Sequence, residues 1–278
     1  MLILILPSVV HAGVFEGFAG VRSAAMGGAQ RAVGSSNEAI YLNPASMAAF
    51  QRFGIDMEIA YEQPEDMRRM RITAVDSKTS TIAAGVGYET IERAEGLPKL
   101  RRTSVAVAYP LGQYIFFGST GHYITGTKLT GDDESALELF NADVGLSLNL
   151  SDVLQLGMSW HNVLDTDEPE LAPESMGFGL AAGTDVLVGA FDVRFRDGAD
   201  GERLTSYHVG SELFFGGALA ARLGYVNQPK SGSSSDQEHV IALGGAYVTQ
   251  AGALAVSMQR ALSDGSPWTV AGALKFFM

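Results

Sequence analysis

The chain has 278 residues, of which 46% are hydrophobic and only 18% charged, with 33 glycines and no cysteine. The lack of cysteine excludes disulfides, thiolate metal sites, a cysteine nucleophile and a lipidated N-terminal cysteine. The net charge of −12 argues against general nucleic-acid binding, which requires a basic face. Beyond the N-terminus no apolar run approaches the ~18 residues of a transmembrane helix, so the apolar residues must lie on two-faced elements.

The N-terminus has the pattern of an export signal. Residues 2–10 form a short apolar run, and Val10, His11 and Ala12 follow as a small-residue pattern suited to signal peptidase. We therefore expect a signal peptide over residues 1–12 and a mature chain that begins at Gly13. No lysine or arginine precedes the run, so the true start could lie upstream or the signal could be unusual. A buried hydrophobic strand is the competing interpretation.

The next segment, residues 13–52, does not alternate between apolar and polar residues. It is rich in small residues and is interrupted by Gly27, Gly28 and Gly34. Asn43 is a good N-cap and Pro44 suits a first helical position, which predicts a short helix over residues 43–50. We expect this segment to be a plug inside the architecture that follows.

From Phe53 to the C-terminus the chain alternates with a period of two, as half-buried strands do. In residues 53–62 the apolar positions include Phe53, Met57 and Ile59, and the polar positions include Asp56 and Glu58. About fourteen such segments occur; the later ones are residues 70–75, 81–89, 102–109, 114–123, 140–148, 154–162, 176–182, 187–196, 207–215, 219–225, 241–247, 254–258 and 268–278.

The connections between these strands alternate between short and long. Residues 110–113 and 216–217 read as tight turns, whereas residues 63–69 and 125–138 read as longer polar loops. Bacterial outer-membrane barrels combine an even strand number with short periplasmic turns and longer outer loops. The length also fits, because each strand with its connection has roughly 16 residues and a tilted membrane strand needs about 9–11.

Charged residues recur on the face opposite the apolar one. They include Asp56, Glu58, Asp143, Asp192, Arg194, Glu212 and Arg222, together with Arg71, Glu89, Arg102 and Lys275. A soluble fold would turn such charges to water, whereas in a barrel they would line the lumen. Aromatic residues near the strand ends would form interfacial girdles. The sequence thus predicts an all-β protein, a closed antiparallel transmembrane β-barrel of about 14 strands over residues 53–278. A barrel of this size would leak without a plug.

Several motifs add a resemblance to a known family. Residues 22–29, RSAAMGGA, with Met26, Gly27 and Gly28, and residues 41–48, YLNPASMA, with Asn43 and Pro44, resemble the plug signature of FadL-like and PorV-like outer-membrane barrels. Residues 157–163, 207–213 and 222–225 are similar to further motifs of these proteins. The resemblance implies a fourteen-stranded barrel with an N-terminal plug in the bacterial outer membrane.

The resemblance also implies two functions. FadL-like members pass fatty acids or aromatic hydrocarbons and release them sideways through a kink in the third strand. Gly85 and Gly87 would permit that kink in this chain, because glycine weakens strands and tolerates bends. PorV-like members instead scaffold a secretion apparatus, and other relatives serve surface motility. We expect an outer-membrane barrel that binds or passes small, fatty-acid-like hydrophobic molecules, with the PorV-like scaffold as the alternative; a non-specific porin is disfavoured because the plug would obstruct diffusion.

The remaining candidate chemistry is weak. The acidic run at residues 165–170 lacks the spacing of a calcium loop, so we expect no metal and no cofactor. His161 and His208 lie on predicted lumenal faces, but no G-x-S-x-G motif accompanies them, and we expect no enzyme. The lumenal charges could form pairs that fix plug and register, or line a conducting path. The expected partners are outer-membrane lipid, a hydrophobic small molecule and other envelope proteins, with no nucleic acid.

Overall fold

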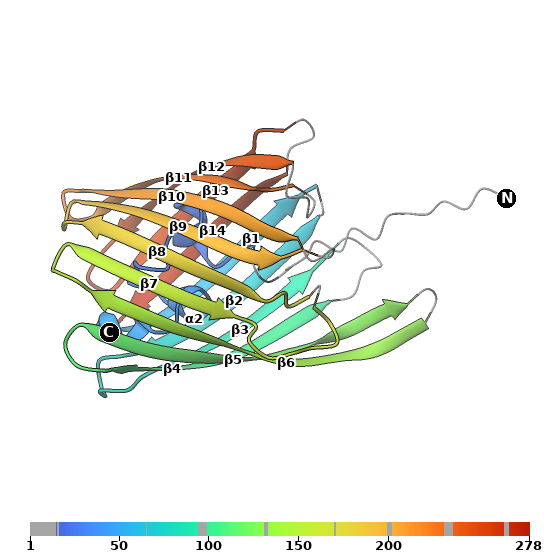
Figure 1. Cartoon of the computed structure of the whole chain (residues 1–278). Coiled ribbons are helices and arrows are strands. Elements are labelled where there is room, and N and C mark those ends of the chain that lie inside the picture. Colours follow the sequence, from blue (N-terminus) through green and yellow to red (C-terminus); the bar gives the residue numbers. More distant parts are fainter. Residues whose placement is uncertain are drawn as a thin grey trace.

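Fourteen antiparallel strands, β1 to β14, form one closed barrel (Figure 1). The structure is a computed structural model that describes residues 15, 17–64, 66–93, 99–130, 133–169, 171–198, 202–230, 236–263 and 267–278. The predicted signal peptide, residues 1–12, lies outside these residues. Each strand pairs with its neighbours in sequence, and β1 closes the ring by pairing with β14. The all-β closed barrel of about 14 strands predicted from the sequence is confirmed.

Each strand corresponds to one of the alternating segments, and several strands, above all β5 and β6, extend beyond the predicted segment. The strands are β1 Phe53–Gln63, β2 Met67–Asp76, β3 Ala83–Glu92, β4 Leu100–Pro110, β5 Ile115–Thr130, β6 Asp133–Asn149, β7 Leu154–His161, β8 Ser175–Gly183, β9 Leu187–Asp197, β10 Arg203–Phe215, β11 Leu219–Pro229, β12 Gln237–Val248, β13 Gly252–Ala261 and β14 Trp268–Phe277.

Alternation along each strand separates an exposed outer face from a buried inner face. On β1, Met57 and Ile59 are about half exposed, whereas Asp56, Glu58 and Ala60 between them are buried. Because successive side chains of a strand point to opposite faces, this pattern puts the large apolar residues outside and the charges inside. This distribution is the reverse of that in a soluble protein, in which apolar side chains are buried and charged side chains are exposed. Its closed sheet also leaves no unpaired edge.

The prediction of a polar loop at residues 125–138 is wrong. β5 and β6 continue as a hairpin to the pair Thr130 and Asp133, and Figure 1 shows this hairpin extending beyond its neighbours. The loop predicted at residues 63–69 is likewise mostly strand, since β1 ends at Gln63 and β2 begins at Met67. At these hairpin ends the backbone groups of each strand are hydrogen-bonded to the partner strand. The strands can therefore continue there without the alternation of apolar and polar residues that marks the rest of the barrel.

The N-terminal segment, residues 15 and 17–52, lies within the ring of strands (Figure 1). It contains three short helices, α1 Val21–Ala25, α2 Ala39–Leu42 and α3 Ser46–Ala49. α1 packs against β11 to β14, and α3 against β3 to β6. In the part of the chain that the structure describes, no helix is long and apolar enough to span a membrane.

The helix predicted over residues 43–50 is shorter than expected. α3 begins at Ser46, and Asn43 is an extended residue that ends α2. The Asn43 Oδ1 atom accepts the N–H of Ala45 at 3.2 Å, so part of the expected capping contact is present. Its amide nitrogen, however, donates to the Arg31 carbonyl (2.8 Å), the Leu146 carbonyl (3.1 Å) and the Ser147 hydroxyl (3.0 Å). Asn43 thus joins the N-terminal segment to β6.

Candidate functional site

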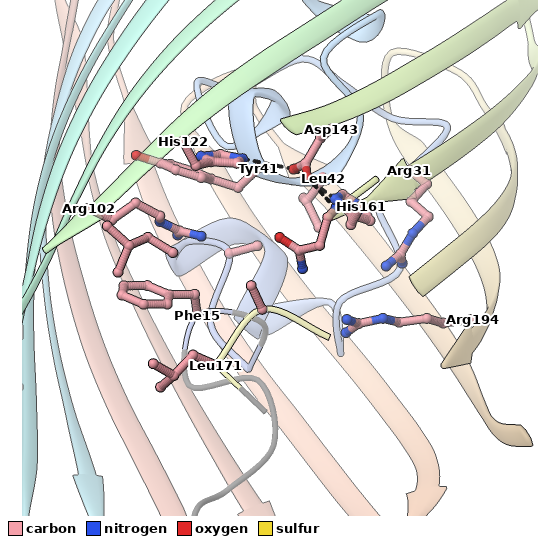
Figure 2. A pocket seen from close by; sticks show the side chains of 14 residues that line it. Phe15, Arg31, Tyr41, Leu42, Arg102, His122, Asp143, His161, Leu171 and Arg194 are labelled. Carbon is pink, nitrogen blue, oxygen red and sulfur yellow. Dashed lines mark hydrogen bonds and ion pairs between the residues drawn. The ribbon is translucent and has the colours of Figure 1, made fainter. Parts of the chain in front are cut away.

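A cavity of about 50 Å³ lies between the N-terminal segment and the inner faces of β4 to β7 and β9 (Figure 2). Its polar wall combines side chains from the segment and from the strands, namely Arg31, Arg102, His122, Asp143, His161 and Arg194. Its apolar wall is formed by Phe15, Leu42, Ile124, Leu171 and Ala172. Charged, polar and apolar side chains thus surround one narrow space.

One carboxylate organises the polar wall. Asp143 Oδ2 accepts hydrogen bonds from His122 Nε2 and His161 Nδ1, each at 2.9 Å (Figure 2). The hydroxyl of Ser104 donates to the other nitrogen of His122 at 2.8 Å, and that of Ser159 donates to His161 at 2.9 Å. Both ring nitrogens of each histidine and both oxygens of Asp143 thus have a hydrogen-bond partner. The network joins β4, β5, β6 and β7 below the cavity.

The Ser159–His161–Asp143 connection has the bonding order of a catalytic triad. A nucleophile must, however, reach its substrate, and Ser159 is only 1% exposed and does not line the cavity. Its Oγ atom also accepts a hydrogen bond from Arg31 Nε at 3.1 Å. The geometry therefore suits a structural network that holds Arg31, and it does not present a nucleophile.

The N-terminal segment is attached to the wall by buried ion pairs. Arg31 Nη1 lies 3.1 Å from Asp192 Oδ2, which also accepts the backbone N–H groups of Gln30 and Arg31 at 3.0 Å. Arg22 and Arg222 both contact Glu212, which is fully buried. Burial lowers the pKa of Arg22, but the Glu212 carboxylate more than offsets this and leaves the pKa above its usual value.

A second cluster surrounds Glu89 on β3. This carboxylate accepts hydrogen bonds from Arg69 (3.0 Å), Arg71 (2.7 Å) and Arg102 (2.6 Å). The Arg71 guanidinium lies 4.3 Å from the centre of the Tyr41 ring, and that of Arg102 lies 4.6 Å from the Phe15 ring and 4.5 Å from Tyr41. Cation–π contacts of this kind are strongest where water is excluded. They place the aromatic residues of the N-terminal segment against the charged wall.

The seven charges predicted to face the lumen all lie on the inner face of the barrel. Asp143, Asp192, Glu212 and Arg222 take part in the contacts above. Asp56 is paired with Lys275 at 2.9 Å, and Glu58 accepts the backbone N–H of Val21 at 3.1 Å. Arg194 lines the cavity and donates to Ser175 at 3.1 Å.

The glycines and small residues predicted to belong to the plug lie where the segment approaches the wall most closely. Gly27 and Gly28 have φ of 63° and 82°, a region that favours glycine. The Gly27 carbonyl accepts a hydrogen bond from His208 at 2.7 Å. Met26 is fully buried against Gly210, where a Cβ would lie 2.5 Å from the Met26 carbonyl oxygen. Pro44 and Ala45 occupy a similar hollow at Gly118.

Gly85 and Gly87 also face the segment. A Cβ on Gly85 would lie 3.0 Å from Ile40 and Met47, and one on Gly87 would overlap the Tyr41 hydroxyl. The ladder of β3 is continuous with β2 on one side and β4 on the other through both glycines. The kink expected in the third strand stays a prediction, and the observed use of these glycines is close packing.

Next to the cavity, the inner faces of β3 to β6 carry a group of apolar residues. Ile91, Leu100, Ile124, Leu137 and Leu139 form a cluster with Phe15 and Ala172, which we call the mouth cluster. These strand residues lie near the barrel end where β3 and β4 are joined by residues 93–99. A path from this end to the cavity thus crosses apolar side chains before it reaches Arg102 and His122.

Sequence analysis missed several residues of this site. Arg31 and Tyr41 belong to the N-terminal segment, and His122 belongs to β5. A charged residue within a segment rich in small residues was the available signal for Arg31. Among the described residues no cluster of histidine, aspartate and glutamate has the arrangement of a metal site.

The fold of this chain is similar to that of several channels and transporters of known structure. The monoaromatic hydrocarbon channel CymD superposes with a TM-score of 0.74 at 12% identity, covering 95% of this chain and 98% of CymD. The toluene transporter TodX of P. putida gives 0.72 at 11% identity, with 95% and 99% covered, and a FadL homologue of Pseudomonas aeruginosa gives 0.71 at 8%, with 92% and 98% covered. The chain has a FadL-like fold, as its motifs predicted. No family model and no curated protein matches the sequence.

Proposed function

We propose that this chain is an outer-membrane channel that binds or passes small hydrophobic molecules of fatty-acid type. In this proposal residues 1–12 are a signal peptide, residues 13–52 a lumenal plug, and residues 53–278 a barrel integral to the bacterial outer membrane. The exposed apolar outer face of the strands, as at Met57 and Ile59, supports membrane embedding, because lipid is the solvent that such a face fits. Outer-membrane lipid is thus the first proposed partner.

The observation that carries the function is the cavity next to the mouth cluster. Its apolar residues, such as Phe15 and Leu171, suit a hydrocarbon body, while Arg31, Arg102 and Arg194 suit an anionic head. Ligand sites generally combine an apolar lining with a few placed polar groups. The similarity in fold to channels for toluene and other hydrocarbons also supports a channel for hydrophobic molecules.

The cavity is small for this task. At about 50 Å³ it is far below the roughly 300 Å³ of an ordinary ligand pocket, so the observed form is a closed one. Binding a fatty acid requires displacement of part of the lining, and the N-terminal segment supplies about half of its apolar residues. No enzymatic step is proposed; the mechanism is binding with local movement.

Uptake of radiolabelled oleate by Gram-negative cells that lack their own fatty-acid channel tests the proposal. Expression of the chain should raise uptake, and Ala172→Trp, which fills the cavity from the mouth cluster, should abolish the increase. Ala84→Trp is the matched control, because Ala84 lies on β3 with its side chain exposed on the outer face. Equal uptake by cells with and without the chain would refute the proposal for fatty acids.

The second candidate is a PorV-like scaffold of a secretion or motility apparatus. It is favoured by the filled lumen, since ion pairs such as Arg31–Asp192 and Arg22–Glu212 fix the segment and leave little open space. Native mass spectrometry of the barrel in mild detergent separates the two candidates. A fatty-acid-sized adduct at one per chain supports the channel, whereas a retained envelope protein without an adduct supports the scaffold.

A further inference from the structure

Beside the cavity, at the end of β7, the regular backbone hydrogen bonding of the barrel wall is interrupted. The ladder between β6 and β7 runs from Asn149, opposite Gln155, only to Val144, opposite Trp160. Beyond that point β6 continues, whereas β7 ends at His161. Residues 141–143 of β6 then face residues 162–164, which follow β7. We call this junction the seam.

Side chains replace much of the backbone ladder at the seam. Its backbone hydrogen bond runs from Val163 N–H to the Ala142 carbonyl at 2.9 Å. The Asn141 side chain accepts the Leu164 N–H at 3.0 Å and donates to the Leu164 carbonyl at 3.2 Å. Asp143 Oδ1 accepts the Asn162 N–H at 2.9 Å. Side-chain bonds can break and re-form without moving a strand, whereas ladder bonds break together.

Asn162 marks the change of path. Its φ of 55° lies in the left-handed region, which asparagine tolerates better than most residues but which remains uncommon outside glycine. The turn at Asn162 shifts the pairing by one residue, so that Val163 rather than Asn162 bonds to Ala142. Such bulges locally disrupt a ladder and occur preferentially at barrel rims and beside functional sites.

The seam separates the cavity from the outside of the barrel by a single layer of residues. On the inner side, Asp143, His161 and Asn162 line the cavity. On the outer side, Phe140 is 59% exposed, Leu164 41% and Trp160 39%. In the proposed membrane orientation these three apolar side chains face lipid, with the Trp160 N–H bonded to Glu174 at 2.7 Å as in an interfacial aromatic residue.

The third strand offers a poorer route. Its ladders with β2 and β4 are continuous, and its inward glycines are covered by Ile40, Tyr41 and Met47 of the N-terminal segment. Opening there would break consecutive backbone hydrogen bonds and displace buried side chains. Opening the seam would break one backbone bond and the side-chain bonds of Asn141 and Asp143.

We propose that the seam is a lateral opening through which a hydrophobic ligand passes between the cavity and the membrane. This inference rests on the proposed channel function and names its route. A fatty acid would keep its carboxylate near Arg31 and Arg194 while its chain passes between Asn141 and Leu164. The exposed Phe140 and Leu164 side chains would then meet the hydrocarbon body at the membrane side.

Locking the seam with a disulfide tests this route in a chain that has no native cysteine. Ala142→Cys with Val163→Cys joins two residues that face each other across the seam and do not line the cavity. Because the Val163 N–H bonds to the Ala142 carbonyl, the two backbones lie as close as hydrogen-bonded strand partners, whose Cα atoms are about 5.5 Å apart, within the range that a disulfide spans. Val86→Cys with Val105→Cys is the matched control, since this exposed pair locks β3 to β4 in the same way.

Oleate and toluene uptake would be measured in cells before and after dithiothreitol, with cross-link closure checked on a non-reducing gel. We expect the seam-locked barrel to lose uptake and to regain it on reduction, while the β3-locked barrel transports in both states. The reduced form serves as the folding control for each pair. A short bis-maleimide bridges the same thiols where oxidation is incomplete.

Uptake that survives the seam lock, or that is lost only with the β3 lock, would overturn the lateral opening and leave the channel function standing. Uptake of neither probe by the chain without cysteines would instead overturn the channel function and the seam with it. The two failures are thus distinguished by the same set of strains.

Discussion

Replacement of Glu89 by glutamine should destabilise the barrel strongly. Glu89 is fully buried, and its carboxylate accepts hydrogen bonds from Arg69, Arg71 and Arg102 at 2.6–3.0 Å. Glutamine has nearly the same volume, so the change removes charge without creating a cavity. It leaves three guanidinium groups in the barrel interior around a neutral amide.

The magnitude follows from the desolvation of those cations. Removing one partner of a buried ion pair typically costs about 3–5 kcal/mol, because the remaining charge is uncompensated. Arg69 and Arg71 each keep a second carboxylate, Glu62 at 3.3 Å and Glu58 at 3.4 Å. We therefore expect the lower end of that range, about 3 kcal/mol.

Glu92→Gln is the matched control on the same strand. Glu92 pairs with Lys99, but both side chains are more than 40% exposed, so the loss of this pair should change the free energy of unfolding little. Urea unfolding in detergent micelles, followed by the fluorescence of Trp160 and Trp268, compares the two variants. A loss for Glu89→Gln no larger than that of the control would refute the claim that the Glu89 carboxylate stabilises the barrel by neutralising the buried arginines.

Three further predictions concern the N-terminal segment. Gly118→Ala should lower the urea midpoint, because the added Cβ would lie 2.5 Å from Pro44 and Ala45, whereas Gly121→Ala, whose Cβ would lie 3.5 Å from Phe140, should not. Asn43→Ala should cost about 1–3 kcal/mol of unfolding free energy, because it leaves buried carbonyls unpaired; an unchanged midpoint would contradict this. Deletion of residues 13–52 should turn a poorly conducting barrel into an open pore in planar bilayers, and equal conductance would argue against a plug.

The fold was accessible from the sequence because its main signal is periodic. Alternation such as that of residues 53–62 persists wherever one face meets an apolar surrounding and the other a polar interior. The same reasoning failed at residues 125–138, because the hairpin of β5 and β6 extends beyond its neighbours and the apolar face is no longer required there. Backbone hydrogen bonds between two paired strands do not require any particular pattern of side-chain polarity, so such a hairpin end is not visible in the sequence pattern.

The cavity could not be predicted in the same way. His122, Asp143 and His161 come from three strands and meet only because of the pairing register, which a single sequence does not reveal. The contacts of Asn43 were predicted only in part, for a related reason. Its local sequence favours a helix cap, but tertiary acceptors at Arg31, Leu146 and Ser147 determine its conformation. Local propensity gives way where buried carbonyl groups need partners.

The attachment of the N-terminal segment constrains how any ligand could pass. Withdrawal of the whole segment would leave Asp192 without Arg31 and Glu212 with Arg222 alone, and an uncompensated buried charge costs several kcal/mol. Arg71 would also lose the carbonyls of Phe18 and Ala19. Movement must therefore be local. The seam beside the cavity is joined by one backbone hydrogen bond and a few side-chain hydrogen bonds. The wall can therefore open there while the ion pairs that hold the N-terminal segment stay intact.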